Sequence, residues 1–119
     1  MQKVNLAQKL RQFSERWSPR IVGELNGQQV KVAKLEGEFV WHHHADEDEL
    51  FLVLRGHLTI HLRDRAIELD PGEFFVVPRG VEHKPVAQEE VHVLLLEPVS
   101  TLNTGNVRNQ FTVDSPERV

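Results

Sequence analysis

The sequence places histidines and a carboxylate where they can bind a transition metal. His42 and His44 are separated by one residue, Glu49 follows after a short acidic stretch, and seven histidines occur in 119 residues. We predict a strand over residues 38–44, and in a strand the side chains at i and i+2 share a face. Both imidazoles can then approach one ion to the roughly 2.0–2.1 Å that coordination requires. Histidines with one carboxylate favour iron, manganese, nickel or zinc over calcium.

On its own the His-x-His pair is a weak indication, because such a pair also arises by chance in a histidine-rich chain. Two neighbouring residues compete to be the carboxylate ligand, Asp48 and Glu49. The phase of the strand that follows favours Glu49, because Glu49 shares a face with Phe51 and Val53.

A second segment, farther along the chain, ends in another candidate ligand. Residues 72–83 contain a turn at Gly72, a short apolar strand, a second turn at Pro78 and Gly80, and then His83. Proline fixes φ and makes this corner rigid, so that it can direct the histidine inward. The spacings of the two segments together are far more specific than either one alone.

The two segments resemble the two motifs of the cupins, a family of small jelly-roll barrels. Four residues separate Gly37 from His42, one fewer than is usual in that family. Starting the motif at His43 would restore the count but would put Ala45 in place of the second histidine. The first motif reads glycine, His-x-His, a short spacer, glutamate, six residues and glycine, and the matching residues are Gly37, His42, His44, Glu49 and Gly56.

The second motif is matched by the segment 72–83, but the asparagine that usually follows it is Ala87 here. In the family this asparagine is not a metal ligand, so the departure affects only the surroundings of the site. The resemblance implies an all-β fold, a cupin jelly-roll β-barrel of the mannose-6-phosphate isomerase-like type, holding one divalent transition metal ion. The metal ligands that it implies are His42, His44, Glu49 and His83.

The amino-terminal region predicts one short helix, over residues 5–17. Asn5 can cap it, Gln8 stands at the third helical position as in a capping box, and Pro19 ends it. We expect this helix to lie over the barrel or over a partner subunit. Its apolar residues recur at helical spacing on one face, and they are Leu6, Leu10, Phe13 and Trp17.

Beyond the helix the pattern is that of short strands and turns, which is typical of a sandwich or a closed barrel. We expect a single cupin domain over 1–119, with the barrel at about 20–98 and a tail at 99–119 whose structure the sequence does not determine. The strands that we predict are 21–25, 29–35, 38–44, 49–54, 57–62, 66–69, 74–77, 81–86 and 91–97.

Composition limits the partners of the chain. A formal charge of −4 gives no general attraction to nucleic acid, and no apolar run approaches the roughly 20 residues of a membrane span. The chain has no cysteine, which suits the cytoplasm. We therefore expect a cytoplasmic protein, without nucleic-acid or membrane partners, that binds a small-molecule ligand or substrate and forms a homodimer.

Two kinds of function are compatible with these residues. The first is a metalloenzyme acting on a small organic molecule, because relatives in this fold include dioxygenases and sugar-phosphate isomerases. The second is a metal-dependent barrel that binds or senses a small ligand without turnover. Only Arg79 and Lys84 are basic near the second motif, so the sequence shows no arginine-rich phosphate pocket. Fold alone does not assign the reaction.

Overall fold

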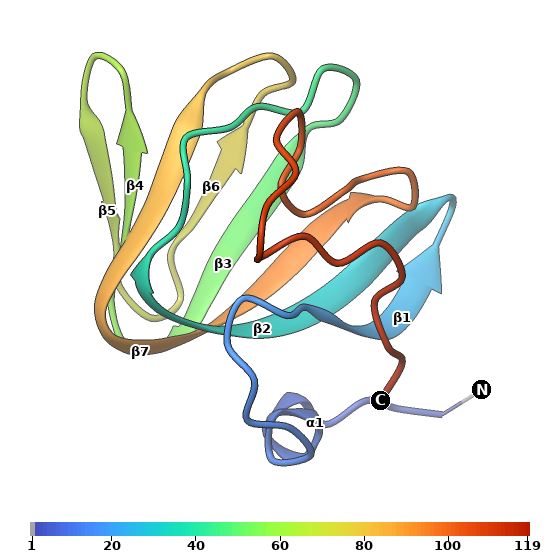
Figure 1. The fold of residues 1–119 in the computed structure, drawn as a ribbon. Coiled ribbons are helices and arrows are strands. Elements are labelled where there is room, and N and C mark those ends of the chain that lie inside the picture. The colour runs from blue at the N-terminus through green and yellow to red at the C-terminus, as the bar shows by residue number, and fades with distance from the viewer. Residues whose placement is uncertain (1) are drawn as a thin grey trace.

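The computed structural model describes residues 2–119, and strands dominate it (Figure 1). No helix in this part of the chain is both long and apolar enough to cross a bilayer. The strands form one antiparallel sheet in the order β1-β2-β7-β3-β6, with β4 paired to both β5 and β7. The elements are α1 (Leu6–Leu10), β1 (Arg20–Leu25), β2 (Gln28–Glu38), β3 (Glu49–Arg55), β4 (Leu58–Leu62), β5 (Ala66–Leu69), β6 (Phe74–Val77) and β7 (His83–Pro98).

Strand β7 closes the sheet into a jelly-roll barrel, because its two halves pair with different neighbours. Its first half pairs with β4, from His83 opposite Leu62 to Val86 opposite Thr59. Its second half pairs with β3, from Val93 opposite Val53 onward. The long strand therefore bends between these regions, as Figure 1 shows, and draws β4 and β5 across from β3 and β6. The all-β fold is confirmed, although one continuous strand, His83–Pro98, takes the place of the two predicted over 81–86 and 91–97.

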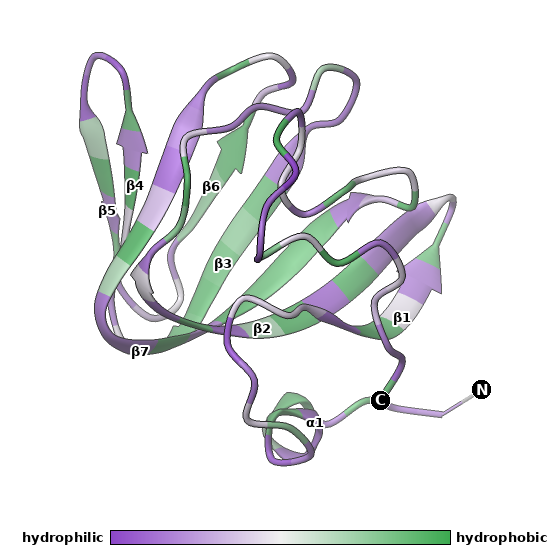
Figure 2. Cartoon of the chain, in the orientation of Figure 1, coloured by the Kyte–Doolittle hydropathy of each residue, from purple (hydrophilic) through white to green (hydrophobic). Residues whose placement is uncertain are grey.

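The core fills the space enclosed by the curved sheet. In β7 buried residues alternate with half-buried ones, as expected for a strand with one face on a core. The same alternation runs along β3, where Phe51 and Val53 point inward. Figure 2 shows the resulting concentration of hydrophobic residues in β3 and β6. The main cluster includes Ala33, Leu35, Phe51, Val53, Leu58, Ile60, Val91, Val93 and Leu95.

The helix is shorter than the sequence predicts. Asn5 does cap it, since its side chain accepts a hydrogen bond from the Gln8 N–H at 3.0 Å, but the helix ends at Leu10 rather than continuing to residue 17. The backbone at Trp17 has φ of +59° and its N–H donates to the Lys34 carbonyl at 2.9 Å. Pairing with the sheet therefore overrides helical propensity in this region.

The apolar face predicted for the helix is divided between two clusters. Leu10 and Phe13 pack with Val32 on the outer side of the sheet. Trp17 instead enters the main core, where its ring stacks on Phe39 with centroids 4.7 Å apart. The 3.6-residue spacing was thus a correct sign of burial but not of a continuous helix.

The strand predicted over 38–44 is wrong. Strand β2 ends at Glu38, and residues 39–48 follow the start of β7 through isolated hydrogen bonds only. Phe39 N–H donates to the Pro85 carbonyl at 3.0 Å, and His42 forms a single antiparallel bridge with His83. The side chains of this segment are therefore placed by local contacts, not by the regular alternation of a strand.

The tail at 99–119 folds back over the open end of the barrel, as Figure 1 shows. It has no regular secondary structure, but hydrogen bonds tie it to the rest of the protein. Asn106 accepts from the His43 N–H through its side chain at 2.9 Å and donates from its backbone to the His43 carbonyl at 3.1 Å. At the carboxyl end, Val119 N–H donates to Ile21 O at 3.1 Å, and between these points Phe111 packs on Phe39. The tail is thus a structural part of the barrel.

Gly105 allows the tail to approach this closely. A Cβ atom at this position would lie 2.1 Å from the carbonyl oxygen of His43, and the glycine has φ of +58°. Gly72 offers a useful comparison, because its φ is +86° but a Cβ there would have no neighbour within 4 Å. The positive φ favours glycine at both positions. Only at Gly105 would a side chain also collide with a neighbouring backbone atom.

We predict that Gly105→Ala destabilises the protein much more than Gly72→Ala. Both changes cost about 1–2 kcal/mol through the positive φ, but only the first pushes the tail off the His43 segment. Urea unfolding of the two variants beside the unmodified protein measures the difference. Equal losses of stability would show that the close approach at Gly105 is not a constraint on the fold.

Candidate metal centre

Four side chains from three segments of the chain meet inside the barrel. His42 and His44 come from the irregular segment 39–48, Glu49 is the first residue of β3, and His83 is the first residue of β7. All four are buried, and one donor atom from each lies within 4.8 Å of the others. The structure therefore brings together all the residues that the resemblance implies as metal ligands.

Backbone bonds hold the three segments in place. His42 N–H donates to the His83 carbonyl at 3.1 Å, and His83 N–H donates back at 2.9 Å. Gly80 N–H donates to the His44 carbonyl at 2.8 Å, which ties the second motif to the first. Asp48, the rival to Glu49, is exposed and accepts from the backbone N–H of Arg79 at 2.8 Å. Its carboxylate therefore joins the two loops and is not one of the four clustered side chains.

Hydrogen bonds to the backbone determine which imidazole nitrogen faces the centre. His42 Nδ1 lies 2.9 Å from Val40 O, and His83 Nδ1 lies 2.9 Å from Val81 O. A carbonyl oxygen only accepts, so each Nδ1 carries the proton and each Nε2 keeps a free lone pair. This is the arrangement by which proteins orient histidine for a metal.

The inward-facing donor atoms have no partner among residues 2–119. Glu49 Oε1, His83 Nε2 and both ring nitrogens of His44 are buried without a hydrogen bond. Glu49 Oε1 lies 3.5 Å from His44 Nε2 and 3.4 Å from His83 Nε2. These separations are long for hydrogen bonds, but ligands about 2.1 Å from one ion at tetrahedral angles lie roughly 3.4 Å apart. The residues fit a divalent transition metal.

The pKa values of His42 and Glu49 are shifted in the directions that favour metal binding. Burial lowers the pKa of His42 to about 4, assisted by the nearby imidazole of His83. Burial alone would raise the pKa of Glu49, but the Glu97 carboxyl and the imidazoles of His44 and His83 outweigh it and hold that pKa well below its usual range. A neutral imidazole and an ionised carboxylate are the forms that bind a metal.

Behind Glu49 lies a buried ion pair that sequence analysis did not find. Lys31 Nζ donates to Glu97 Oε1 at 2.8 Å, and both side chains are almost fully buried. The pairing of Leu50 with Leu96 places Glu97 next to Glu49 across β3 and β7. Burial, and then the charge of Glu49, hold the pKa of Glu97 well above its usual range, with Lys31 opposing them. Of the two neighbouring carboxyls, Glu49 is therefore the one that ionises more readily.

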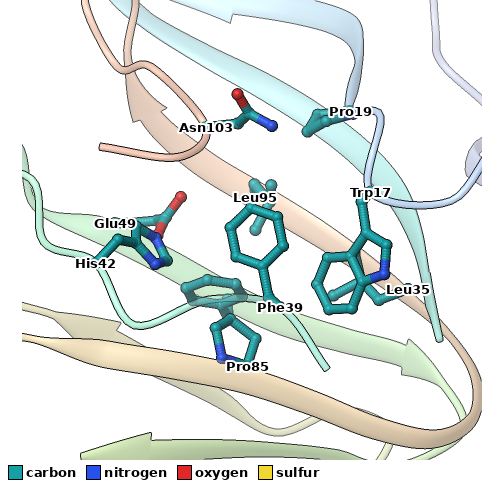
Figure 3. A pocket seen from close by; sticks show the side chains of 10 residues that line it. Trp17, Pro19, Leu35, Phe39, His42, Glu49, Pro85, Leu95 and Asn103 are labelled. Carbon is teal, nitrogen blue, oxygen red and sulfur yellow. The ribbon is translucent and has the colours of Figure 1, made fainter. Parts of the chain in front are cut away.

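A small cavity begins at the cluster and runs toward the amino-terminal segment (Figure 3). Its volume is about 40 Å³, and it is partly open to solvent. His42 and Glu49 lie at one end, and Trp17 and Leu35 lie at the other. The tail contributes Asn103 to its wall. The full lining is Trp17, Pro19, Leu35, Phe39, His42, Glu49, Phe51, Pro85, Leu95 and Asn103.

Comparison with known proteins agrees with this geometry. Residues 28–97 match the family described as Cupin domain. The chain belongs to the cupin family. The matched region includes both motifs and all four clustered side chains. The narrower likeness to mannose-6-phosphate isomerase does not follow from this match.

Solved structures include close relatives of this cupin. A cupin-2 domain containing protein from Shewanella frigidimarina is 50% identical, with a TM-score of 0.79 over 80% of this chain and 93% of that one. Protein NMB1881 from Neisseria meningitidis is 30% identical, with a TM-score of 0.75 over 82% of this chain and 99% of that one.

A curated relative, the uncharacterized protein YdbB of Bacillus subtilis, is 39% identical over 64 residues. These residues are 53% of this chain and 57% of that protein, so the match spans little more than half of the relative. None of these three names states a substrate.

We predict that Lys31→Met destabilises the metal-free protein by about 3–5 kcal/mol, because the buried negative charge of the neighbouring Glu49 and Glu97 carboxyls loses its cation. The matched control is Lys84→Met, which removes an ion pair between Lys84 and the exposed Glu38 and should cost less than about 1 kcal/mol. Urea unfolding in the presence of a chelator measures both free energies. A loss for Lys31→Met no greater than that of the control would contradict the account of the buried pair.

Proposed function

We propose that this cupin binds one divalent transition metal ion through His42, His44, Glu49 and His83, and that it is an enzyme acting on a small organic molecule beside the metal. The observation that supports this most directly is the set of buried donor atoms without hydrogen-bond partners at the end of the cavity. Leaving such atoms unpaired costs free energy that metal coordination would recover. The bound metal would supply Lewis-acid or redox chemistry.

Within this proposal we favour a dioxygenase-like reaction over sugar-phosphate isomerisation. Among the described residues that line the cavity, the acidic and basic ones are Glu49 and His42, and the lowered pKa of His42 leaves its imidazole neutral. Arg79 pairs with Asp48 at 3.4 Å, and Lys84 pairs with Glu38 at 2.6 Å. Both basic residues of the second motif are therefore neutralised by local acids, and phosphate recognition lacks a cation beside the metal.

The function is tested by metal analysis together with an oxygen-uptake assay, on protein purified without a histidine tag or a chelating column. Stoichiometric iron and oxygen uptake stimulated by a compound from a panel of small organic molecules would support a dioxygenase. Zinc without turnover of any compound would instead support the alternative, a barrel that binds or senses a ligand. Absence of any bound metal, even after incubation with iron, manganese, nickel and zinc salts, would contradict the whole proposal.

We predict that His83→Ala lowers the metal content at least tenfold, because it removes a ligand whose Nε2 faces the centre. His43→Ala is the matched control, since His43 lies between two of the ligands in sequence but outside the cluster. Elemental analysis of the two variants, purified in parallel, should show full occupancy only for His43→Ala. Equal metal content in both variants would refute the assignment of His83.

We also propose that a second copy of the chain covers the outer face of the sheet, forming a cytoplasmic homodimer. One row of apolar residues crosses four strands, where Val30 pairs with Leu96, Leu96 with Leu50, and Leu50 with Val76. In the next row Phe74, which is 61% exposed, lies opposite Leu52. Contiguous apolar surface of this kind favours association, and a two-fold axis lets one patch cover its copy.

We predict that Phe74→Asp gives a monomer, because each copy would bury a new charge in the apolar face. Leu25→Asp is the matched control, since Leu25 is 52% exposed at the end of the β1–β2 hairpin. Light scattering should give twice the chain mass of 13.7 kDa for the unmodified protein and for the control, and 13.7 kDa for Phe74→Asp. A monomeric unmodified protein would contradict this proposal.

A further inference from the structure

A groove lies on the outside of the barrel, between helix α1 and strands β2, β3 and β7. It shares no lining residue with the metal centre or with the cavity beside it. We propose that this groove binds a small organic anion with an apolar body, such as a medium-chain carboxylate or phosphate ester. The inference goes beyond the proposed function, because such binding needs neither a metal ion nor a reaction.

Apolar side chains cover one part of the groove. Leu6 and Leu10 come from α1, and Leu54 comes from β3. Leu10 is buried with Val32 on the outer side of the sheet, and Leu6 and Leu54 pack against this small cluster while staying half exposed. The short helix therefore covers the strands incompletely. An apolar ligand body would remove the remaining surface from water, which favours binding.

A row of basic residues crosses the strands of the groove. Lys34 of β2 pairs with His92 of β7, and His92 pairs with Arg55 of β3. Residues that pair across antiparallel strands share a face of the sheet, so these three side chains are neighbours. Arg11, which directly follows α1, adds a fourth basic residue from the helix.

The positive charge of the groove is not balanced within it, since no acidic residue of the described chain lines it. Within residues 2–119, neither Arg11 nor Arg55 forms an ion pair or a side-chain hydrogen bond. Lys34 Nζ donates to the Phe13 carbonyl at 2.5 Å and lies 5.2 Å from the centre of the Phe13 ring. Neither of these groups carries a formal charge.

In the described part of the chain, Glu90 is the carboxylate that contacts this lining. Glu90 Oε2 lies 3.0 Å from His92 Nε2, and Glu90 Oε1 accepts from Arg16 Nε at 3.0 Å. Glu90 is therefore shared by two basic side chains and does not neutralise the lysine and the two arginines of the groove. Three formal positive charges without an acid, in a chain of formal charge −4, favour an anionic partner.

The size of the groove and the shape of its donors suit a small molecule. Its volume is about 380 Å³, within the range of roughly 300–1,000 Å³ that is usual for small-molecule sites. A guanidinium group binds a carboxylate or a phosphate through paired N–H donors. The head group would therefore lie at Arg11 and Arg55, with the apolar body along the three leucines.

Binding is measured by NMR on ¹⁵N-labelled protein, with a chelator present so that no anion can bind through a metal ion. The ligands are octanoate and octyl phosphate, and the controls are acetate, which lacks the apolar body, and octan-1-ol, which lacks the charge. Both ligands should shift the backbone amide signals of Arg11 and Arg55 and leave that of Asp64, in the β4–β5 turn, in place. Each control should bind roughly tenfold more weakly than octanoate, because it keeps only one of the two attractions.

Arg55→Gln tests the contribution of charge. It should raise the dissociation constant of octanoate about fivefold, and the double variant with Arg11→Gln should bind no octanoate. Both arginines are exposed, so the changes should have little effect on folding. Arg63→Gln is the matched control, because Arg63 is also exposed and pairs with Glu82 outside the groove, and it should leave the constant unchanged.

A head group that binds more tightly than the other would identify the anion as a carboxylate or a phosphate. Absence of shifts at Arg11 and Arg55 with both ligands would overturn the proposal, as would acetate or octan-1-ol binding as tightly as octanoate. Shifts confined to the four clustered metal-centre residues would also overturn it. Binding that occurs only in Phe74→Asp would show that a second copy covers the groove, and would overturn it for the assembled protein. Each of these failures would leave the proposed function standing, because metal content does not enter the measurement.

Discussion

The site depends on the pair of backbone hydrogen bonds between His42 and His83. Residues 39–48 have no regular strand, so this bridge fixes the distance between the two motifs where a ladder would otherwise do so. Each imidazole is then oriented by its own Nδ1 bond to a carbonyl two residues earlier, Val40 or Val81. Main-chain carbonyls thus orient two of the three imidazoles, whereas His44 and Glu49 Oε1 have no such bond. A metal ion would add the attraction that holds the unpartnered donors together.

The same irregular segment also shapes the space beside the centre. Phe39 begins it, stacks on Trp17 and touches His42 with its edge. His43 is not one of the clustered residues, and its backbone N–H donates to the Asn106 side chain of the tail at 2.9 Å. A displacement of the tail would therefore move both Phe39 in the cavity wall and the histidines of the cluster, since all of them belong to residues 39–48. The tail thereby contributes to the site although only Thr101 and Thr104 among its residues are buried.

The sequence predicted most of the strands and all four clustered residues, because strand alternation and motif spacing are local signals. The strand predicted over 38–44 is wrong, and the helix predicted over 5–17 is present but ends at Leu10. Leu10 and Phe13 are buried against the outer side of the sheet, whereas Trp17 and Phe39 stack in the main core. Their burial therefore comes from separate tertiary contacts rather than from a repeating backbone. The tail was beyond prediction, because Asn106 and Gly105 acquire their roles only where the tail meets His43.

The buried pair behind Glu49 shows the limit of local patterns most clearly. Lys31 and Glu97 occupy inward positions of β2 and β7, where the alternation predicts apolar residues, and 66 positions separate them in the sequence. Neither is interpretable alone, since a buried charge is costly until its partner is known. Once β7 brings them together, Lys31 donates to Glu97, and Glu97 stands beside Glu49 with the higher pKa of the two carboxyls. The negative charge of the inner wall is thereby concentrated on the one carboxylate that faces the histidines.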